Sequence, residues 1–222
     1  MKHSTEFIWN QVDYVLDNCK KHNITTPSRA DTKLSSFISE LMNWNKRFNL
    51  VSTGDLNIVG QRHILDSLSP LAYFSPAKNC KLLDIGSGAG FPAIPLKLFR
   101  PDIDMTLVEA KRKKSLFLKA CASFLGFDNY RVEWSRIEDI KPNADYDIVT
   151  SRATMAPAKM AKVAIDYIKP GGKIILFIGP SEFQKIDLLK STFYKLGYSL
   201  LLSRKSPFTD KDLHLLLGMK SK

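Results

Sequence analysis

The sequence predicts an α/β fold in which a mostly parallel sheet follows an N-terminal helical region. Apolar residues recur at helical spacing over residues 5–73, and from Lys81 onward short apolar runs alternate with helical stretches. Such alternation is typical of a parallel sheet that helices cover on both faces. We therefore expect a helical cap over residues 1–79 and a sheet-containing domain over residues 80–222, forming one compact unit.

The cap is predicted from two apolar stripes and a further helical stretch. One stripe runs from Phe7 to Cys19 and the other from Leu34 to Trp44, with the helix-breaking residues 25–28 between them. A third helix is expected over residues 58–71, and strand patterns are few throughout this region.

The sheet is predicted from five apolar runs followed by a closing pair. The five runs occupy residues 81–85, 105–108, 130–134, 147–150 and 173–178. The intervening helices are expected at residues 94–99, 113–125, 157–168 and 182–196. A turn at residues 169–172 should precede the fifth run. Residues 199–202 and 213–219 are close in sequence, so we expect them to form an antiparallel edge.

Net charge leaves two interpretations open. The 222 residues carry a formal charge of +11, of which residues 1–79 supply +2 and the remaining residues +9. An excess of this size suits a polyanionic partner, but a merely basic surface would have the same composition. Charge alone therefore does not identify the partner.

Cysteine spacing and hydropathy exclude several classes of protein. The three cysteines, Cys19, Cys80 and Cys121, form no CxxC pair, so we expect buried free thiols and no metal site. No apolar run reaches the roughly 18 residues of a membrane span. The N-terminus also lacks a signal-peptide pattern, so a soluble cytoplasmic protein is expected.

A glycine-rich loop, Gly86-Ser87-Gly88-Ala89-Gly90, follows the first predicted strand directly. Ligands of open α/β sheets bind at the carboxyl ends of strands, and glycines let the backbone approach them closely. The dinucleotide fingerprint GxGxxG would require glycine at Phe91, and the phosphate-loop pattern GxxxxGK[ST] is absent. The loop therefore departs from the patterns that bind pyrophosphate or triphosphate groups.

Two carboxylates flank this loop. Asp84 stands two residues before the first glycine, where it can orient the loop or reach the amino-acid end of a zwitterionic ligand. Glu109 ends the second strand and can accept hydrogen bonds from both hydroxyls of a ribose. A ribose without a pyrophosphate fits S-adenosylmethionine, so we expect this methyl donor as cofactor and S-adenosylhomocysteine as product. A turn followed by a solvated acid is the alternative.

The segment after the third strand is the candidate adenine loop. It comprises residues 135–139, in which Ile137 would supply an apolar face and Glu138 a polar neighbour. An ordinary connection between a strand and a helix remains the alternative interpretation.

The sequence also limits the methyl acceptor. Displacement at a sulfonium methyl requires mainly that the nucleophile be aligned with the methyl carbon. A cytosine-C5 enzyme needs a cysteine that follows a proline at the end of a strand, and this sequence has none. Enzymes that methylate exocyclic amines carry an Asn/Asp-Pro-Pro-aromatic motif, which residues 150–154 lack. Acceptors that are nucleophilic without activation, such as a purine N7, remain possible. A 2′-hydroxyl would need a base, but Lys97, Lys111 and Lys173 form no convincing set.

Arg152 is the residue to which we assign the acceptor step. It follows the fourth strand, and its guanidinium could bind a phosphate, stack on a base or donate to a guanine edge. A structural ion pair with Asp84 or Glu109 is the alternative.

Basic residues near the site form the candidate RNA-binding set. Residues 111–114 open a helix, where positive charge opposes the helix dipole, so phosphate contact is favoured over a solvated face. The cap adds three further residues, of which the histidine is assigned no proton transfer. The predicted set is Arg47, Arg62, His63, Lys111, Arg112, Lys113 and Lys114.

Four segments together resemble one family. They are residues 44–50 (WNKRFNL), 62–68 (RHILDSL), 84–95 (DIGSGAGFPAIP) and 151–153 (SRA). Their order and spacing are similar to those of the RsmG methyltransferases, also called glucose-inhibited division protein B, over nearly the whole chain. The resemblance implies a Rossmann-like class I methyltransferase fold. It also implies an enzyme that methylates N7 of one guanine in bacterial 16S rRNA.

The resemblance also suggests roles for individual residues. Gly86 and Phe91 would contact the cofactor, and Arg152 would lie on its other side. With the loop and its neighbours, the predicted cofactor contacts are Asp84, Gly86, Ser87, Gly88, Gly90, Phe91, Glu109, Ile137, Glu138 and Arg152. Two positions depart from the family pattern. Ala93 replaces the glycine of GFPGIP, and Ile178-Gly179 stands where the family often has Lys-Gly, so another basic residue would have to replace that lysine.

The expected partner is 16S rRNA, either within the 30S subunit or in an assembly intermediate, and the expected state is a monomer. Two other functions remain possible from the residues alone. One is a methyltransferase for a small molecule, and the other is a non-catalytic RNA-binding module of the same fold.

Overall fold

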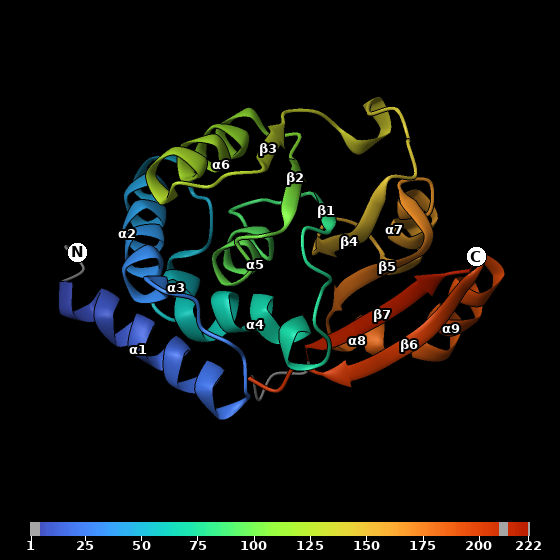
Figure 1. Cartoon of the computed structure of the whole chain (residues 1–222), viewed down its shortest axis with the longest axis horizontal. Helices are drawn as coiled ribbons and strands as arrows, with labels where there is room; N and C mark the ends of the chain where they lie inside the picture. The colour runs from blue at the N-terminus through green and yellow to red at the C-terminus, as the bar shows by residue number, and fades with distance from the viewer. Residues whose placement is uncertain (1–4, 209–212, 222) are drawn as a thin grey trace.

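The computed structural model describes residues 5–208 and 213–221, and its centre is a seven-stranded sheet (Figure 1). The strands are β1 (Lys81–Ile85), β2 (Asp104–Val108), β3 (Tyr130–Glu133), β4 (Tyr146–Arg152), β5 (Ile168–Ile178), β6 (Tyr198–Lys205) and β7 (His214–Lys220). They lie in the order β3-β2-β1-β4-β5-β7-β6. Neighbours from β3 to β5 pair in parallel, whereas β7 pairs antiparallel with β5 and β6. The predicted parallel sheet with an antiparallel edge is confirmed.

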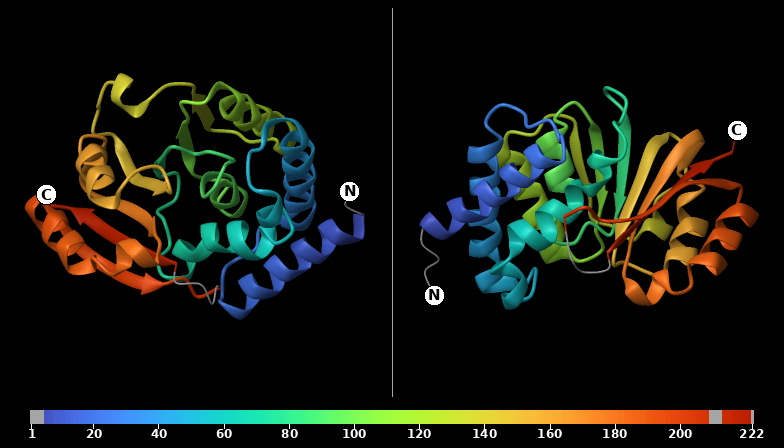
Figure 2. Two further views of the ribbon diagram at one scale, coloured as in Figure 1. Left: turned by 180° about the vertical axis from the view of Figure 1, so that it is seen from behind. Right: turned by 90° about the horizontal axis from the view of Figure 1, so that it is seen from below.

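Helices cover both faces of the sheet (Figure 2). They are α5 (Ala93–Phe99), α6 (Arg112–Leu125), α7 (Pro157–Ala164), α8 (Pro180–Phe183) and α9 (Ile186–Lys195). Successive residues of a strand point to opposite faces. Leu82 therefore packs in the core formed with α5 and α6, and Leu83 packs in the core formed with α7 and α9. Burial on both faces explains why the central strands have nearly continuous apolar sequences.

The N-terminal residues form a helical cap, as predicted. Its segments are α1 (Thr5–Lys21), α2 (Ala30–Phe48), α3 (Thr53–Leu56), the π-helix η1 (Gly60–Ile64), α4 (Leu65–Leu68) and the 3₁₀-helix η2 (Ser69–Ala72). The cap contacts α5 and α6, and its apolar residues join theirs in one continuous core. In Figure 1, α2 lies beside α6 and α4 lies beneath α5. The division between residues 79 and 80 stays a prediction.

The helix expected over residues 58–71 is present as one unbroken helical stretch, but its pitch changes along the three segments η1, α4 and η2. Pro70 lies in the first turn of η2 and has no backbone N–H, so the α-helical hydrogen-bond ladder cannot continue through it. The π-helix η1 is a rarer departure, of a kind that is frequent at functional sites.

Two boundaries in the second half are wrong. β5 begins at Ile168, and the expected turn at residues 169–172 is a bulge within that strand, between the pairs Tyr146–Ile168 and Ile148–Lys173. The expected helix 182–196 is divided into α8 and α9. Leu189 and Phe193 of α9 are buried, whereas α8 packs through the partly buried Phe183, which stacks on His214.

The cysteines are buried and free, as expected. Within residues 5–208 and 213–221, no group of three or more His, Cys, Asp and Glu side chains could hold a metal ion. None of the helices described here is both long enough and apolar enough to cross a membrane.

Candidate functional site

The glycine-rich loop turns sharply at the carboxyl end of β1. Gly86 has φ +75° and Gly90 has φ +89°, a region that side chains with a Cβ rarely adopt. A Cβ on Gly86 would come within 2.4 Å of the Thr154 side chain, and one on Gly90 within 2.3 Å of Ile94. Both positions therefore require glycine for their conformation and for space.

Backbone hydrogen bonds attach this loop to the end of β2. The amides of Gly86 and Ser87 donate to the carbonyl of Val108 at 2.8 and 3.2 Å. The amide of Gly88 donates to Oε2 of Glu109 at 2.8 Å, and the amide of Lys111 donates to Oε1 at 2.8 Å. The predicted ribose carboxylate thus lies against the loop. Each of its oxygens still has a lone pair with which to accept from a ligand hydroxyl.

Asp84 lies beneath the loop and is fully buried. Its Oδ1 accepts a hydrogen bond of 2.6 Å from the Thr150 hydroxyl, and its backbone carbonyl accepts one of 3.1 Å from Ser87. No protein group within the described part of the chain bonds to Oδ2. Burial raises the pKa of Asp84 to about 6, and the nearby charge of Glu109 adds to that rise.

The segment with Ile137 and Glu138 lies in the 3₁₀-helix η3 (Ile137–Asp139). Ile137 is buried in the core that contains α7, and its carbonyl accepts a hydrogen bond of 2.7 Å from the Tyr167 hydroxyl. Glu138 is exposed. The segment is therefore fixed by packing on one side and leaves a carboxylate available on the other.

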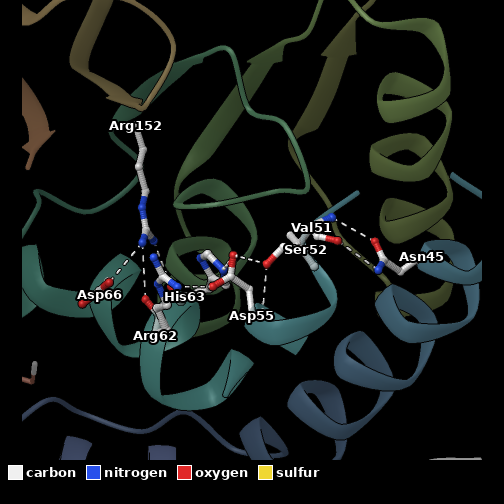
Figure 3. A network of polar contacts seen from close by, with 8 residues as sticks. All are labelled: Asn45, Val51, Ser52, Asp55, Arg62, His63, Asp66 and Arg152. Carbon is white, nitrogen blue, oxygen red and sulfur yellow. Dashed lines mark hydrogen bonds and ion pairs between the residues drawn. The ribbon is translucent and has the colours of Figure 1, made fainter. Parts of the chain in front are cut away.

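Arg152 ends β4, and its guanidinium points into the cap (Figure 3). Nη2 donates to Oδ2 of Asp66 at 3.0 Å, and the two side chains are only 14% and 5% exposed. Nη2 also donates to the carbonyl of Arg62 at 3.3 Å, and Nη1 donates to that of His63 at 3.4 Å. The ion pair considered for Arg152 exists, but the expected partners Asp84 and Glu109 are wrong. The cap supplies Asp66 instead.

The cap residues around Arg152 are held by a second carboxylate. Asp55 forms an ion pair with the side chain of Arg62, lies 3.7 Å from Nε2 of His63, and accepts a hydrogen bond of 2.7 Å from Ser52 (Figure 3). Burial lowers the pKa of His63 to about 4, and the charge of Arg152 adds to this effect. His63 is therefore neutral near pH 7, consistent with assigning it no proton transfer.

The His63 ring also contacts the glycine-rich segment. It stacks on Phe91 with ring centroids 4.9 Å apart, and Phe91 meets Phe37 of α2 edge-on at 5.6 Å. Phe91 is thus buried between the loop and the cap. Arg62 and His63 of the cap therefore lie between two parts of the site. The His63 ring contacts the glycine-rich segment, and the backbone carbonyls of both residues contact Arg152.

The other predicted basic residues lie at the surface. Arg47 is exposed near the end of α2, and residues 111–113 are exposed where α6 begins. Arg112 lies over the ring of Trp134 at 5.7 Å, and Lys113 lies over that of Phe48 at 5.4 Å. Lys114 is half-buried; its Nζ would lie 3.7 Å from a Cβ on Gly88. Lys114 therefore lies beside the loop, and the other cations lie around the start of α6 and the end of α2.

Sequence reasoning missed Asp66, Asp55 and Thr150. Asp66 lies within the RHILDSL segment that carries the family resemblance, so the signal was present, but nothing local links it to a residue 86 positions away. Thr150 lies two residues before Arg152 on a strand that pairs with β1 next to Asp84. Its role required knowledge of the strand register.

A family model described as rRNA small subunit methyltransferase G, GidB, matches residues 30–206. The chain belongs to this family. The Ribosomal RNA small subunit methyltransferase G of Hahella chejuensis is 30% identical over 214 residues, which cover 96% of each chain. The protein of the same name from Mycoplasma capricolum is 34% identical over 180 residues, which cover 81% of this chain and 78% of the relative.

Solved structures share the fold of this GidB family member. A SAM-dependent methyltransferase from Aquifex aeolicus superposes with a TM-score of 0.59 at 15% identity, covering 82% of this chain and 97% of that one. TYW2 from M. jannaschii in complex with AdoMet gives 0.56 at 18% identity, covering 76% of each chain. The Rossmann-like methyltransferase fold is confirmed.

Membership in the GidB family makes this protein an S-adenosylmethionine-dependent rRNA methyltransferase. The residues present fit the cofactor. Asp84 Oδ2 is a buried carboxylate oxygen without a protein partner in the described structure, and the Glu109 oxygens have lone pairs beside the loop. An ammonium and a ribose are the groups that such acceptors suit.

Proposed function

We propose that this protein transfers the methyl group of S-adenosylmethionine to N7 of a guanine in bacterial 16S rRNA. The observation that supports this most directly is the position of Arg152. It ends the strand next to β1, whose carboxyl end carries the glycine-rich loop, so an acceptor beside Arg152 would also lie beside the methyl donor.

The surrounding chemistry favours an acceptor that needs no activation. When bound, the cofactor supplies an electrophilic methyl group on a sulfonium. The three thiols are buried, and burial raises the pKa of Cys80 to about 11, so these cysteines are unsuited to attack a pyrimidine carbon. A guanine N7 has a free lone pair and requires orientation without a general base.

Each site residue then has a defined task. Glu109 binds the ribose, Asp84 supports the loop and accepts from the amino-acid end of the cofactor, and η3 borders the adenine. Gly86, Ser87, Gly88, Gly90 and Phe91 shape the backbone around the cofactor. Arg152 contacts the cofactor and orients the guanine with its guanidinium, acting as a hydrogen-bond donor and positive charge.

The exposed cations at the start of α6 and the end of α2 contact phosphates of the RNA. Arg47, Lys111, Arg112 and Lys113 carry this role most directly because they are exposed. Arg62 and His63, which are mainly engaged with Asp55, support the RNA-facing part of the cap. The substrate is the 30S subunit or an assembly intermediate, and the protein acts as a cytoplasmic monomer.

The direct test is methyl transfer to ribosomal particles. Purified protein and labelled S-adenosylmethionine are incubated with 30S subunits from a strain that lacks the modification, and nucleosides are separated after digestion. We expect label in N7-methylguanosine. Label only in a small molecule would support a small-molecule methyltransferase instead. Cofactor binding without transfer to any RNA would support a non-catalytic RNA-binding module.

A further inference from the structure

The guanidinium of Arg152 lies over the ring of Phe177 at 5.9 Å, and one short stretch of the cap accepts its hydrogen bonds in the described structure. These three hydrogen bonds go to the Asp66 carboxylate and to the carbonyls of Arg62 and His63, all within residues 62–66 (Figure 3). A guanidinium has five N–H donors. Within the described structure, the other two donors of Arg152 have no recorded protein partner, so they remain for a ligand.

Asp66 is the only charged acceptor among these three groups. The two carbonyl contacts are longer, at 3.3 and 3.4 Å against 3.0 Å for the carboxylate. A charged acceptor makes the shorter and stronger hydrogen bond, and more so in a site that is largely closed to water. Loss of the carboxylate would leave a buried guanidinium with two weak contacts and several possible orientations.

The stretch that carries Asp66 is itself well anchored. Asp55 holds the Arg62 side chain, Ser52 bonds to Asp55, and His63 stacks on Phe91. The amide of Gly60, at the start of η1, donates to the Gln11 side chain of α1 at 3.0 Å. Arg152 is thus bound to a part of the cap that contacts the glycine-rich segment.

We propose that Asp66 is a positioning residue for methyl transfer, because its carboxylate fixes the Arg152 guanidinium so that the unpaired donors face the acceptor guanine. The inference rests on the proposed role of Arg152 and deepens it. Asp66 does not contact the acceptor; it acts through Arg152. The carbonyls of Arg62 and His63 complete the cradle, but they carry no charge.

The protonation of Asp66 should give kcat a pH dependence that a residue with only a structural role would not produce. Burial raises the pKa of Asp66 to about 6, although Arg152, Arg62 and the Ser206 hydroxyl facing it oppose the rise. The charged pair is therefore present above about pH 6 and is lost as the pH falls through that value. We expect kcat to fall with it.

The experiment compares Asp66→Asn, Asp66→Glu and the wild-type protein on 30S particles. Asp66→Asn keeps the shape but removes the charge, so kcat should drop by roughly 10- to 100-fold. Cofactor affinity, measured by calorimetry, should stay unchanged, and the residual activity should lose the fall below about pH 6. Asp66→Glu should recover part of kcat because it restores a carboxylate.

Asp102→Asn is the matched control. Asp102 is also a partly buried carboxylate paired with an arginine, Arg100, at 2.7 Å, but it lies away from the residues described above. Its substitution should leave kcat unchanged. An Asp66→Asn protein with wild-type kcat, or with kcat reduced only in proportion to its folded fraction, would overturn the inference. If Asp66→Asn does not fold, a wild-type kcat that stays level between pH 7 and pH 5 would overturn it equally.

Arg152→Ala separates this inference from the proposed function. If that variant keeps wild-type turnover, the role of Arg152 is wrong and the role of Asp66 is wrong with it. If Arg152→Ala is inactive while Asp66→Asn turns over normally, only the positioning role of Asp66 is wrong. If both lose kcat but retain cofactor binding, the inference is supported.

Discussion

Arg152 has a structural contact in the cap, and we propose that it also acts in the reaction. Its buried charge needs a counter-charge, which Asp66 supplies, and yet its donors are not all used. Breaking a buried pair from one side is normally costly because the remaining charge is left unpaired. Here the pKa of Asp66 is already raised to about 6, so its carboxyl can take up a proton when the arginine is removed.

This situation makes Arg152→Ala a useful variant. We expect a folded protein that binds the cofactor more weakly, because one contact is lost, and that transfers methyl groups about 100-fold more slowly even at saturating cofactor, because the acceptor is no longer oriented. Circular dichroism, calorimetry and single-turnover transfer to 30S particles measure the three quantities. Arg152→Lys should recover little, because an ammonium lacks the planar set of donors. Turnover near the wild-type rate in either variant would show that the guanidinium does not act on the acceptor.

His63 gives a second prediction at this scale, about stability and pH. Its pKa is about 4 in the folded protein against an ordinary value of 6.5, owing to burial and to Arg152, with Arg62 adding to and Asp55 opposing the shift. The unfolded chain therefore binds more protons between these values, and stability is lost as the pH falls from 6.5 towards 4.

The variant His63→Asn should remove this dependence. The free energy of unfolding, measured by urea titration, should fall less steeply with acidification than in the wild type, by up to about 1.4 kcal/mol per pH unit. Identical slopes for the two proteins between pH 6.5 and pH 4 would contradict the burial of a neutral imidazole.

At the scale of elements, the glycine-rich loop depends on contacts with β2 and with the connection after β4, which are distant in sequence, and with α5, which follows it directly. The end of β2 accepts its amides, Thr154 fills the space above Gly86, and Ile94 fills that above Gly90. The loop conformation is therefore set by β2, by the connection after β4 and by α5 together.

Gly90→Ala tests this dependence, with Gly126→Ala as the matched control. Both glycines have positive φ, at +89° and +61°, but a Cβ on Gly126 meets nothing within 4 Å, whereas one on Gly90 lies 2.3 Å from Ile94. Gly90→Ala should weaken cofactor binding about tenfold or more, which corresponds to ~1.4 kcal/mol of loop distortion. Gly126→Ala should bind the cofactor normally and lose only some stability. Equal cofactor affinities for the two variants in calorimetry would contradict the account of the loop.

At the scale of the whole molecule, charge is the property that matters most for a large RNA substrate. The net charge is +11, and exposed cations lie at the start of α6 and the end of α2. Their attraction to phosphates acts through release of counterions, so affinity should fall steeply with salt.

A triple variant, Lys111→Gln, Arg112→Gln and Lys113→Gln, should lower the slope of log affinity against log salt by about 2, because each phosphate contact with single-stranded RNA contributes roughly 0.7. Binding to 16S rRNA fragments by filter assay measures the slope. The control changes Lys185, Lys190 and Lys195 to glutamine, three exposed lysines in and beside α9, which covers the other sheet face. If both triple variants change the slope equally, the α6 charges have no special role in RNA binding.

Much of the fold followed from the sequence because local signals carry it. The strands are buried on both faces, so their apolar runs stand out, and the glycines that end β1 are required by local geometry. The expected turn at residues 169–172 lies within β5, and the expected helix over residues 58–71 is present but changes pitch along its length. A turn-like sequence can bulge within a strand when a neighbouring strand pairs with it, and short helical segments take the pitch that packing and Pro70 allow.

The sequence by itself determined the candidate site for the methyl donor, because the loop, Asp84 and Glu109 lie at ends of strands that the apolar pattern already located. Only the tertiary structure decided what surrounds Arg152. Its partner Asp66 is 86 residues away and comes from the cap, and no local pattern encodes which carboxylate meets a buried guanidinium. That choice depends on how the cap packs against the sheet helices, since a buried charge is tolerated only where packing brings its counter-charge.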